Sequence, residues 1–200
     1  IEDVSFGKQF LEVAQRASQK KPVIILKSGA SQAGAMAASS HTGALAGSDR
    51  AYEVAFKQSG VLRARTMEGL FDLAKSFAKH PLPKGDRIAV ITNAGGPGII
   101  TTDWIEKEDL KMAEFEKETA QALRKGLPPE ASIYNPVDVL GDALADRFDF
   151  ALQTVLKDPN VDGVLLLLCP VATAQPEKTA EAAINAQKKF PDKPIFASYM

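Results

Sequence analysis

Uninterrupted apolar runs recur along this chain, and a helical pattern follows each of them. The runs are VIILK at 23–27, IAVIT at 88–92 and VDGVLLLLC at 161–169. Strands covered by helices on both faces have this continuous pattern, whereas strands with one face in water alternate. Parallel strands also need long crossover connections, which the helical segments supply. The sequence therefore predicts an α/β fold with doubly wound, mostly parallel sheets of flavodoxin-like type.

The second half of the chain shows this alternation most clearly. It predicts four strands, at 88–92, 110–115, 161–169 and 193–198, and helices through Trp104 and at 117–125, 148–156 and 176–189. Trp104 lies at helical spacing from Ile100, which favours a core position over a ligand platform.

The first half predicts a helix, the strand 23–27, helices starting at Ser48 and Met67, and a short strand at 61–65 between them. Residues 79–87 contain two prolines, a glycine and several charges, and so predict an exposed linker. We place the domain boundary there, giving domains 1–84 and 85–200, with His80 a solvated residue without a role. The chain starts at Ile1 and enters a helical pattern almost at once, so we expect a truncated first domain in a fragment of a longer protein.

Composition excludes several classes of protein. The 200 residues are 45% hydrophobic with a formal net charge of −1, and no basic cluster indicates nucleic-acid binding. No apolar run approaches the roughly 20 residues of a membrane span, and no signal peptide is evident. The single cysteine, Cys169, excludes an internal disulfide, is compatible with a cytoplasmic protein, and is interpreted as a buried apolar thiol. We identify no metal-ligating cluster.

The segment from Ser28 to Gly47, SGASQAGAMAASSHTGALAG, consists almost entirely of Gly, Ala, Ser and Thr around one histidine, His41. It follows a predicted buried strand, and ligands of open α/β sheets gather beyond the carboxyl ends of strands. We interpret it as a mobile loop that presents the imidazole as a nucleophile or base. The alternative is a helix, favoured by the alanines at 33–38, in which His41 is merely hydrogen-bonded.

A second candidate site is the turn NAGGPG at 93–98, between a predicted buried strand and a helix. Free backbone N–H groups at a helix N-terminus stabilise a phosphoryl group, and glycines let it approach. The turn has neither the Lys-Ser/Thr of a P-loop nor the GxGxxG spacing of a dinucleotide fold. A purely structural turn is the alternative. Together, a presented imidazole and a phosphate-sized cradle suggest a phosphohistidine carrier.

These motifs resemble the NDP-forming acyl-CoA synthetases, which include ADP-forming acetate–CoA ligase and succinyl-CoA synthetase. The resemblance runs from KPVIILKSGASQAGAMAASSHTGALAGSD through ITNAGGPG, NPVDVLG and DPNVDGVLLL, and SSHTGALAG is its most specific part. It implies that His41 is phosphorylated within a histidine loop formed with its neighbours Ser39, Ser40, Thr42 and Gly43. It also implies a phosphate cradle of Asn93, Gly95, Gly96 and Gly98.

The same resemblance places acyl-substrate contacts weakly at Pro170, Val171 and Ala172. It further implies a glutamate that orients the histidine, which we expect to precede Ile1. Glu2 and Asp3 lie nearby in the sequence, but we assign that role to neither.

By this resemblance the chain is part of an ADP-forming acyl-CoA ligase of the acetate–CoA ligase alpha-subunit type. Such an enzyme interconverts acyl-CoA, ADP and phosphate with a carboxylic acid, CoA and ATP. We expect Mg²⁺ to accompany ATP or ADP, CoA to be a substrate, and an ATP-grasp domain or beta subunit and a CoA-binding domain to complete a homo- or hetero-oligomer. The chain alone is expected to be inactive. Alternatives are a regulatory sensor fused to an acetyltransferase, against which the retained His41 argues, and a non-catalytic assembly module.

Overall fold

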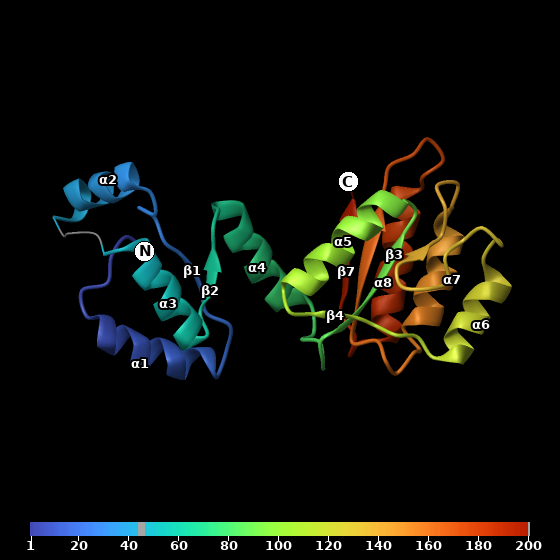
Figure 1. Cartoon of the computed structure of the whole chain (residues 1–200), viewed down its shortest axis with the longest axis horizontal. Helices are drawn as coiled ribbons and strands as arrows, with labels where there is room; N and C mark the ends of the chain where they lie inside the picture. The colour runs from blue at the N-terminus through green and yellow to red at the C-terminus, as the bar shows by residue number, and fades with distance from the viewer. Residues whose placement is uncertain (44–46, 200) are drawn as a thin grey trace. The chain divides into compact units, whose positions relative to one another are not determined.

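A computed structural model describes residues 1–43 and 47–199. The chain divides into two compact units, Ile1–Lys79 and His80–Met200, which are described separately. Parallel strands flanked by helices build both units (Figure 1). The predicted α/β class is thereby confirmed.

The described residues of the first unit form a pair of parallel strands and four helices. Its elements are α1 (Gly7–Ser18), β1 (Ile24–Leu26), α2 (Gln32–Thr42), α3 (Asp49–Ser59), β2 (Leu62–Ala64) and α4 (Met67–Lys79). Helices α1 and α3 pack together over a core of Ala14, Tyr52, Phe56 and Val61. Strand β1 is only half-buried, contrary to the prediction of burial on both faces, because β2 is its one partner among the described strands.

The second unit alternates strands and helices throughout. Its elements are β3 (Arg87–Thr92), α5 (Gly95–Lys107), β4 (Lys111–Met112), α6 (Lys117–Gly126), β5 (Val137–Asp138), α7 (Ala145–Val155), β6 (Gly163–Leu168), α8 (Pro176–Lys189) and β7 (Ile195–Tyr199). The strands pair in the order β4-β3-β6-β7, all parallel, and β5 also pairs with β3.

Alternate residues of the central strand β3 enter two different cores. Ala89 and Ile91 are fully buried in the core that includes residues of α7 and α8. Ile88 and Val90 pack on the opposite face with Ile105 of α5. Helices α5 and α8 accordingly lie on opposite sides of the sheet in Figure 1. This double covering explains why the strand sequence is apolar without interruption.

Strand β5 was not predicted, since two residues within a loop carry no periodicity. It pairs with Ile91 and Thr92, while β4 pairs with Arg87 and Ile88 on the same strand. Asn135 fills the interval: its Oδ1 accepts from Val90 N at 2.9 Å, and its Nδ2 donates to Ile88 O at 2.8 Å. One side chain thus replaces the missing ladder bonds between β4 and β5.

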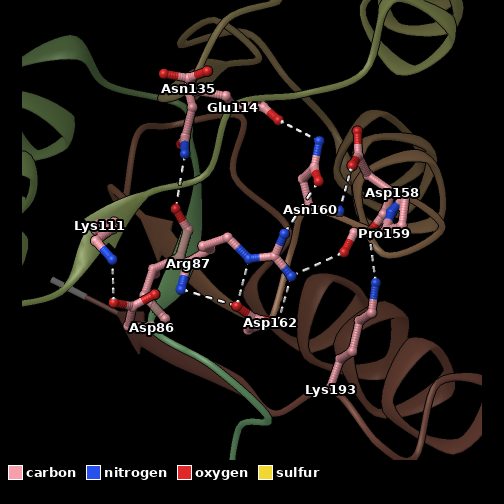
Figure 2. A network of polar contacts seen from close by, with 11 residues as sticks. Asp86, Arg87, Lys111, Glu114, Asn135, Asp158, Pro159, Asn160, Asp162 and Lys193 are labelled. Atoms are coloured by element: carbon pink, nitrogen blue, oxygen red, sulfur yellow. Dashed lines mark hydrogen bonds and ion pairs between the residues drawn. The ribbon is translucent and has the colours of Figure 1, made fainter.

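A polar network fastens the amino ends of β3 and β6 (Figure 2). The Arg87 guanidinium donates to both carboxylate oxygens of Asp162, at 2.8 and 2.9 Å, and also to Asn160 Oδ1. Asp158 accepts from the backbone N–H groups of Asn160 and Glu116. Asp162 is only 8% exposed, so its negative charge must be compensated by the Arg87 guanidinium instead of by water. The residues of the DPNVDG motif therefore have structural partners.

Two sequence expectations about single side chains were wrong. Trp104 is 52% exposed, on the outward face of α5 with Ile100, and Lys107 Nζ lies 4.0 Å from its ring centroid. The inward face of α5 is supplied by Ile105 and Gly98 instead. His80 is not a solvated linker residue, because its ring lies 4.7 Å from that of Phe196 within the same unit.

We expect Asp162→Asn to lower the free energy of unfolding by about 2 kcal/mol, since it leaves the guanidinium with a neutral partner. Arg87 holds the pKa of Asp162 below its ordinary value of 3.8. The pair's contribution is therefore present above the unfolded pKa and is lost as the pH falls through the folded pKa. Urea unfolding of both proteins at neutral and acidic pH measures the difference.

The matched control is Asp192→Asn, which breaks the ion pair with Lys84. Both side chains of that pair are 72% exposed, so the change should stay within about 0.5 kcal/mol. A difference for Asp162→Asn that stays constant into acid would mean that packing, not the ion pair, carries the effect.

Candidate functional site

His41 lies in the last turn of helix α2, not in a loop, so the loop prediction was wrong and the helical alternative describes this segment. Ser31 caps the helix, its Oγ accepting from Gly34 N at 3.1 Å. Gly43 ends it in the left-handed conformation, at φ 71°, with its N–H donated to Ser39 O. A glycine is favoured there because other residues are strained at positive φ.

Some small residues of this segment allow close packing between α2 and the turn before it. Gly29, at φ 70°, lies beneath α2, where a Cβ atom would be 3.3 Å from Gly34 O and 3.4 Å from Ala38 Cβ. Larger side chains would push the helix away from the turn that follows β1. Gly29, Gly34 and Ala38 therefore allow α2 to lie close against this turn.

The imidazole of His41 is nevertheless accessible, with 78% of the side chain exposed. Its Nδ1 lies 3.0 Å from Glu2 Oε2. That hydrogen bond, together with the glutamate's charge, raises the pKa of His41 above its ordinary value of 6.5. With Nδ1 donating its proton to the carboxylate, the lone pair of the neutral ring resides on Nε2. In the neutral ring this arrangement leaves Nε2 as the atom that can act as a base or nucleophile.

Glu2 was missed by sequence reasoning, which left the orienting carboxylate outside the chain. Glu2 and His41 are 39 positions apart, and no local pattern links them. The N-terminal segment brings them together because it runs beside the end of β1: Ser28 N donates to Ile1 O at 3.0 Å. The contact between Glu2 and His41 therefore arises from the tertiary fold and could not be inferred from their spacing in the sequence.

The neighbours of His41 have local roles. Ser40 Oγ donates to Met36 O at 3.0 Å, one turn back along the helix. Ser39 contributes the carbonyl that accepts from Gly43. The side chain of Thr42 and residues 44–46 lie outside the described residues. None of the described contacts of Ser39, Ser40 or Gly43 reaches the imidazole.

The predicted cradle does form the first turn of a helix. Helix α5 starts at Gly95, and its N-cap Ala94 offers no side-chain acceptor. The first N–H groups of a helix have no partner within it, so Gly95 and Gly96 present donors that no capping side chain covers. Buried Thr92 fixes the turn: its Oγ1 accepts from Ala94 N at 3.0 Å and donates to Ala94 O at 3.1 Å.

The three glycines of the cradle differ in their surroundings. A Cβ atom on Gly96 would meet nothing within 4 Å, so this residue faces open space. On Gly98 it would lie 3.2 Å from Thr92 Cγ2, which makes Gly98 a packing residue. On Gly95 it would lie 3.6 Å from Asp138 Oδ2, at the end of β5.

Asn93 is 2% exposed and ties β3 to β6 at their carboxyl ends. Its Oδ1 accepts from Cys169 N at 2.8 Å and its Nδ2 donates to Cys169 O at 3.0 Å. Half-buried Cys169 directly follows β6, and Pro170, Val171 and Ala172 continue as an exposed loop. The predicted substrate loop and the cradle therefore leave the same edge of the sheet.

Among residues 1–43 and 47–199, no group of three His, Cys, Asp or Glu side chains is arranged to hold a metal ion. No helix in the described part of the chain has the length and apolarity needed to cross a membrane.

Comparison with known families divides the chain as the folding units do. Residues 1–77 match the model of the succinyl-CoA ligase like flavodoxin domain, and residues 88–200, more than half of the chain, match that of the Ligase-CoA domain. The chain belongs to the Ligase-CoA domain family. The resemblance to acyl-CoA synthetases that the sequence motifs indicated is confirmed.

This Ligase-CoA chain is 47% identical over its whole length to the ADP-forming acetate–CoA ligase II subunit alpha of Pyrococcus furiosus. It is 44% identical to the ADP-forming 4-hydroxybutyrate–CoA ligase of Nitrosopumilus maritimus. A solved structure of acetyl-coenzyme A synthetase 1 from Ca. Korarchaeum cryptofilum, in complex with phosphate and ADP, superposes with a TM-score of 0.91 at 37% identity. The chain spans 44%, 29% and 44% of these proteins, respectively, and all of it is covered in each match.

Replacing Glu2 with Gln should lower the pKa of the His41 imidazole toward its ordinary value of 6.5, because the neutral amide favours imidazolium less than a carboxylate does. NMR titration of ring-labelled histidine measures this pKa, and the signal that disappears in His41→Asn identifies the residue. Glu12→Gln, at an exposed position on α1, is the control and should leave the titration unchanged. An unchanged pKa in Glu2→Gln would show that the contact does not persist in solution.

Proposed function

We propose that this chain is the phosphohistidine-carrying part of an ADP-forming acyl-CoA ligase, with His41 as the phosphoryl acceptor. The observation that carries the proposal is the accessible imidazole whose Nδ1 lies 3.0 Å from Glu2 Oε2, a contact that leaves the lone pair of the neutral ring on Nε2. The two relatives from Pyrococcus furiosus and Nitrosopumilus maritimus are both named ADP-forming CoA ligases, which supports a ligase over a sensor or an assembly module.

The proposed sequence of reactions has three steps. Phosphate attacks the acyl-CoA thioester, giving acyl phosphate and CoA. His41 Nε2 then attacks the phosphorus, so the P–O bond to the acyl group breaks and the carboxylic acid leaves. ADP finally attacks the phosphohistidine, which forms ATP and restores the imidazole. ATP, ADP and CoA are thus substrates, and Mg²⁺ accompanies the nucleotide.

Glu2 acts on the imidazole in this scheme. Nε2 gains positive character as it forms the bond to phosphorus, and the carboxylate at Nδ1 stabilises that charge. The same interaction raises the pKa of His41, so the neutral, reactive ring becomes more abundant as pH rises through that pKa.

We infer that the first turn of α5 binds a phosphoryl group in the same reaction sequence. Gly95 and Gly96 contribute N–H donors, Gly98 allows the helix to pack closely on Thr92, and buried Asn93 holds the turn in place. Pro170, Val171 and Ala172, at the same sheet edge, are proposed to contact the acyl substrate. The remaining machinery, an ATP-grasp module and a CoA-binding domain, belongs to other domains or a partner subunit in a cytoplasmic oligomer.

Replacing His41 with Asn should abolish phosphorylation, because the amide cannot accept the phosphoryl group. The experiment uses the full-length protein with any partner subunit, radiolabelled ATP and Mg²⁺. Wild type should acquire an acid-labile, base-stable label that CoA plus a carboxylic acid discharges. His80→Asn, the one other histidine of the chain, should retain it. Label that survives in His41→Asn, or no label in wild type, would refute the proposed function.

Gly96→Val should slow phosphoryl transfer without unfolding the protein, since the new side chain projects into open space where the phosphoryl group would bind. Gly7→Val is the matched control, because Gly7 also starts a helix and a Cβ there meets nothing within 4 Å. Single-turnover labelling compares the two variants with wild type. Equal rates in all three would make the turn purely structural.

A further inference from the structure

One buried tyrosine binds the N-terminal segment that carries Glu2. Tyr52, on α3, is 8% exposed and packs on Phe56, with 5.9 Å between their ring centroids. Its hydroxyl donates to Asp3 Oδ1 at 2.6 Å and accepts from Val4 N at 2.9 Å. Two residues directly following Glu2 are thus bound to a side chain fixed in the core.

Tyr52 also contacts the chain that follows the histidine helix. A Cβ atom on Gly47 would lie 3.2 Å from Tyr52 Cε2, so the backbone passes directly over the ring. The Asp3 carboxylate also interacts with the backbone of Gly47. Tyr52 therefore supports both segments that flank the imidazole, the one bearing Glu2 and the one after α2.

The surroundings hold this tyrosine in one orientation. Lys27, 5% exposed, places its ammonium 4.6 Å from the ring centroid and donates to Ser28 O. The hydrogen bond from Tyr52 lowers the pKa of Asp3, while burial and that same bond raise the pKa of Tyr52. Asp3 therefore stays an ionised acceptor and Tyr52 a neutral donor across the physiological range.

We propose that Tyr52 is a positioning residue for the Glu2–His41 pair, fixing the carboxylate against Nδ1 through its hydroxyl contacts with Asp3 and Val4. The proposal rests on the proposed function, because it assigns Tyr52 to the same phosphoryl-transfer site. Tyr52 touches neither the imidazole nor the phosphoryl group. It acts by removing the freedom of Glu2 to swing into solvent, where its exposed side chain would otherwise move.

The test is Tyr52→Phe in the full-length protein, which keeps the ring packing and the lysine contact but removes both hydroxyl bonds. We expect the pKa of His41 to fall toward 6.5 by NMR titration. We also expect single-turnover labelling from radiolabelled ATP and Mg²⁺ to slow by about tenfold. Tyr134→Phe is the matched control: Tyr134 is 72% exposed, and its variant should match wild type in both measurements.

A second pair of variants separates the effect of the hydrogen bond between Tyr52 and Asp3 from the effect of the Asp3 charge. Asp3→Ala removes the acceptor of the tyrosine hydroxyl and should resemble Tyr52→Phe. Asp3→Asn keeps an acceptor oxygen while removing the charge, so it should restore the labelling rate relative to Asp3→Ala. This comparison keeps the proposal testable even if Tyr52→Phe folds poorly.

The outcomes divide clearly. An unchanged His41 pKa in folded Tyr52→Phe, or an unchanged labelling rate, overturns the positioning role, as does failure of Asp3→Asn to recover. If wild type acquires no label, the proposed function fails and its link to Tyr52 falls with it. The titration still decides whether Tyr52 holds the pair, because it requires no phosphorylation.

Discussion

The pairing of β3 with β6 is the constraint on which the second unit depends. Five consecutive residue pairs join these strands in parallel, from Ile88 with Gly163 to Thr92 with Leu167. Because the register is parallel, the strands' carboxyl ends coincide, and Asn93 locks them by two bonds to the backbone of Cys169. The turn that starts α5 is therefore held by buried groups at its base. A cradle made of backbone N–H groups needs this, since it has no side chain to adjust.

The histidine site of the first unit is organised differently. His41 lies in the last turn of a short helix, and its carboxylate partner comes from the N-terminal segment, 39 positions earlier in the sequence. In the positioning role proposed above, the partner is held through Tyr52, whose ring lies against buried Lys27, and not through α2 itself. The exposed imidazole of His41 is thus combined with the buried side chain of Tyr52, which binds the segment that carries Glu2. This combination leaves Nε2 accessible while the ring's other nitrogen is fixed.

Elements with long apolar or helical patterns could be predicted from the sequence. Features that depend on one tertiary contact could not. Strands β3 and β6 were predicted because both their faces are covered, and α5 because glycine and proline mark its start. Strand β5 was missed, because its two residues depend on Asn135 and on the edge of β3 left beside β4. Trp104 was misplaced because helical spacing identifies a stripe but not which of two apolar stripes faces the sheet.

For the candidate site, composition identified His41 and the glycine turn but not Glu2. The small residues around His41 were interpreted as mobility, whereas Gly29 shows that they permit close packing of α2. Both properties require the same residue types, so composition alone cannot separate them. Only the tertiary contact between Glu2 and Nδ1 distinguishes a presented nucleophile from an ordinary surface histidine.

The charges at the two candidate sites are consistent with the proposed phosphoryl carrier, which must bind the phosphoryl group and then release it. No residue from Asn93 to Gly98 carries a charge, and the nearby Asp138 carboxylate lies beside Gly95, so the N–H donors and the helix dipole are the groups of this turn that attract a phosphoryl group. A lysine or arginine there would bind the phosphoryl group equally well in the ground state and in the transition state. Such uniform binding would retain the group without speeding its transfer. In the proposed reaction Glu2 instead acts on the imidazole, where it would stabilise the positive charge that develops as the bond to phosphorus forms. The proposed chemistry thus depends on where charge appears during transfer, and a turn without a lysine or arginine does not hold the phosphoryl group by an ion pair.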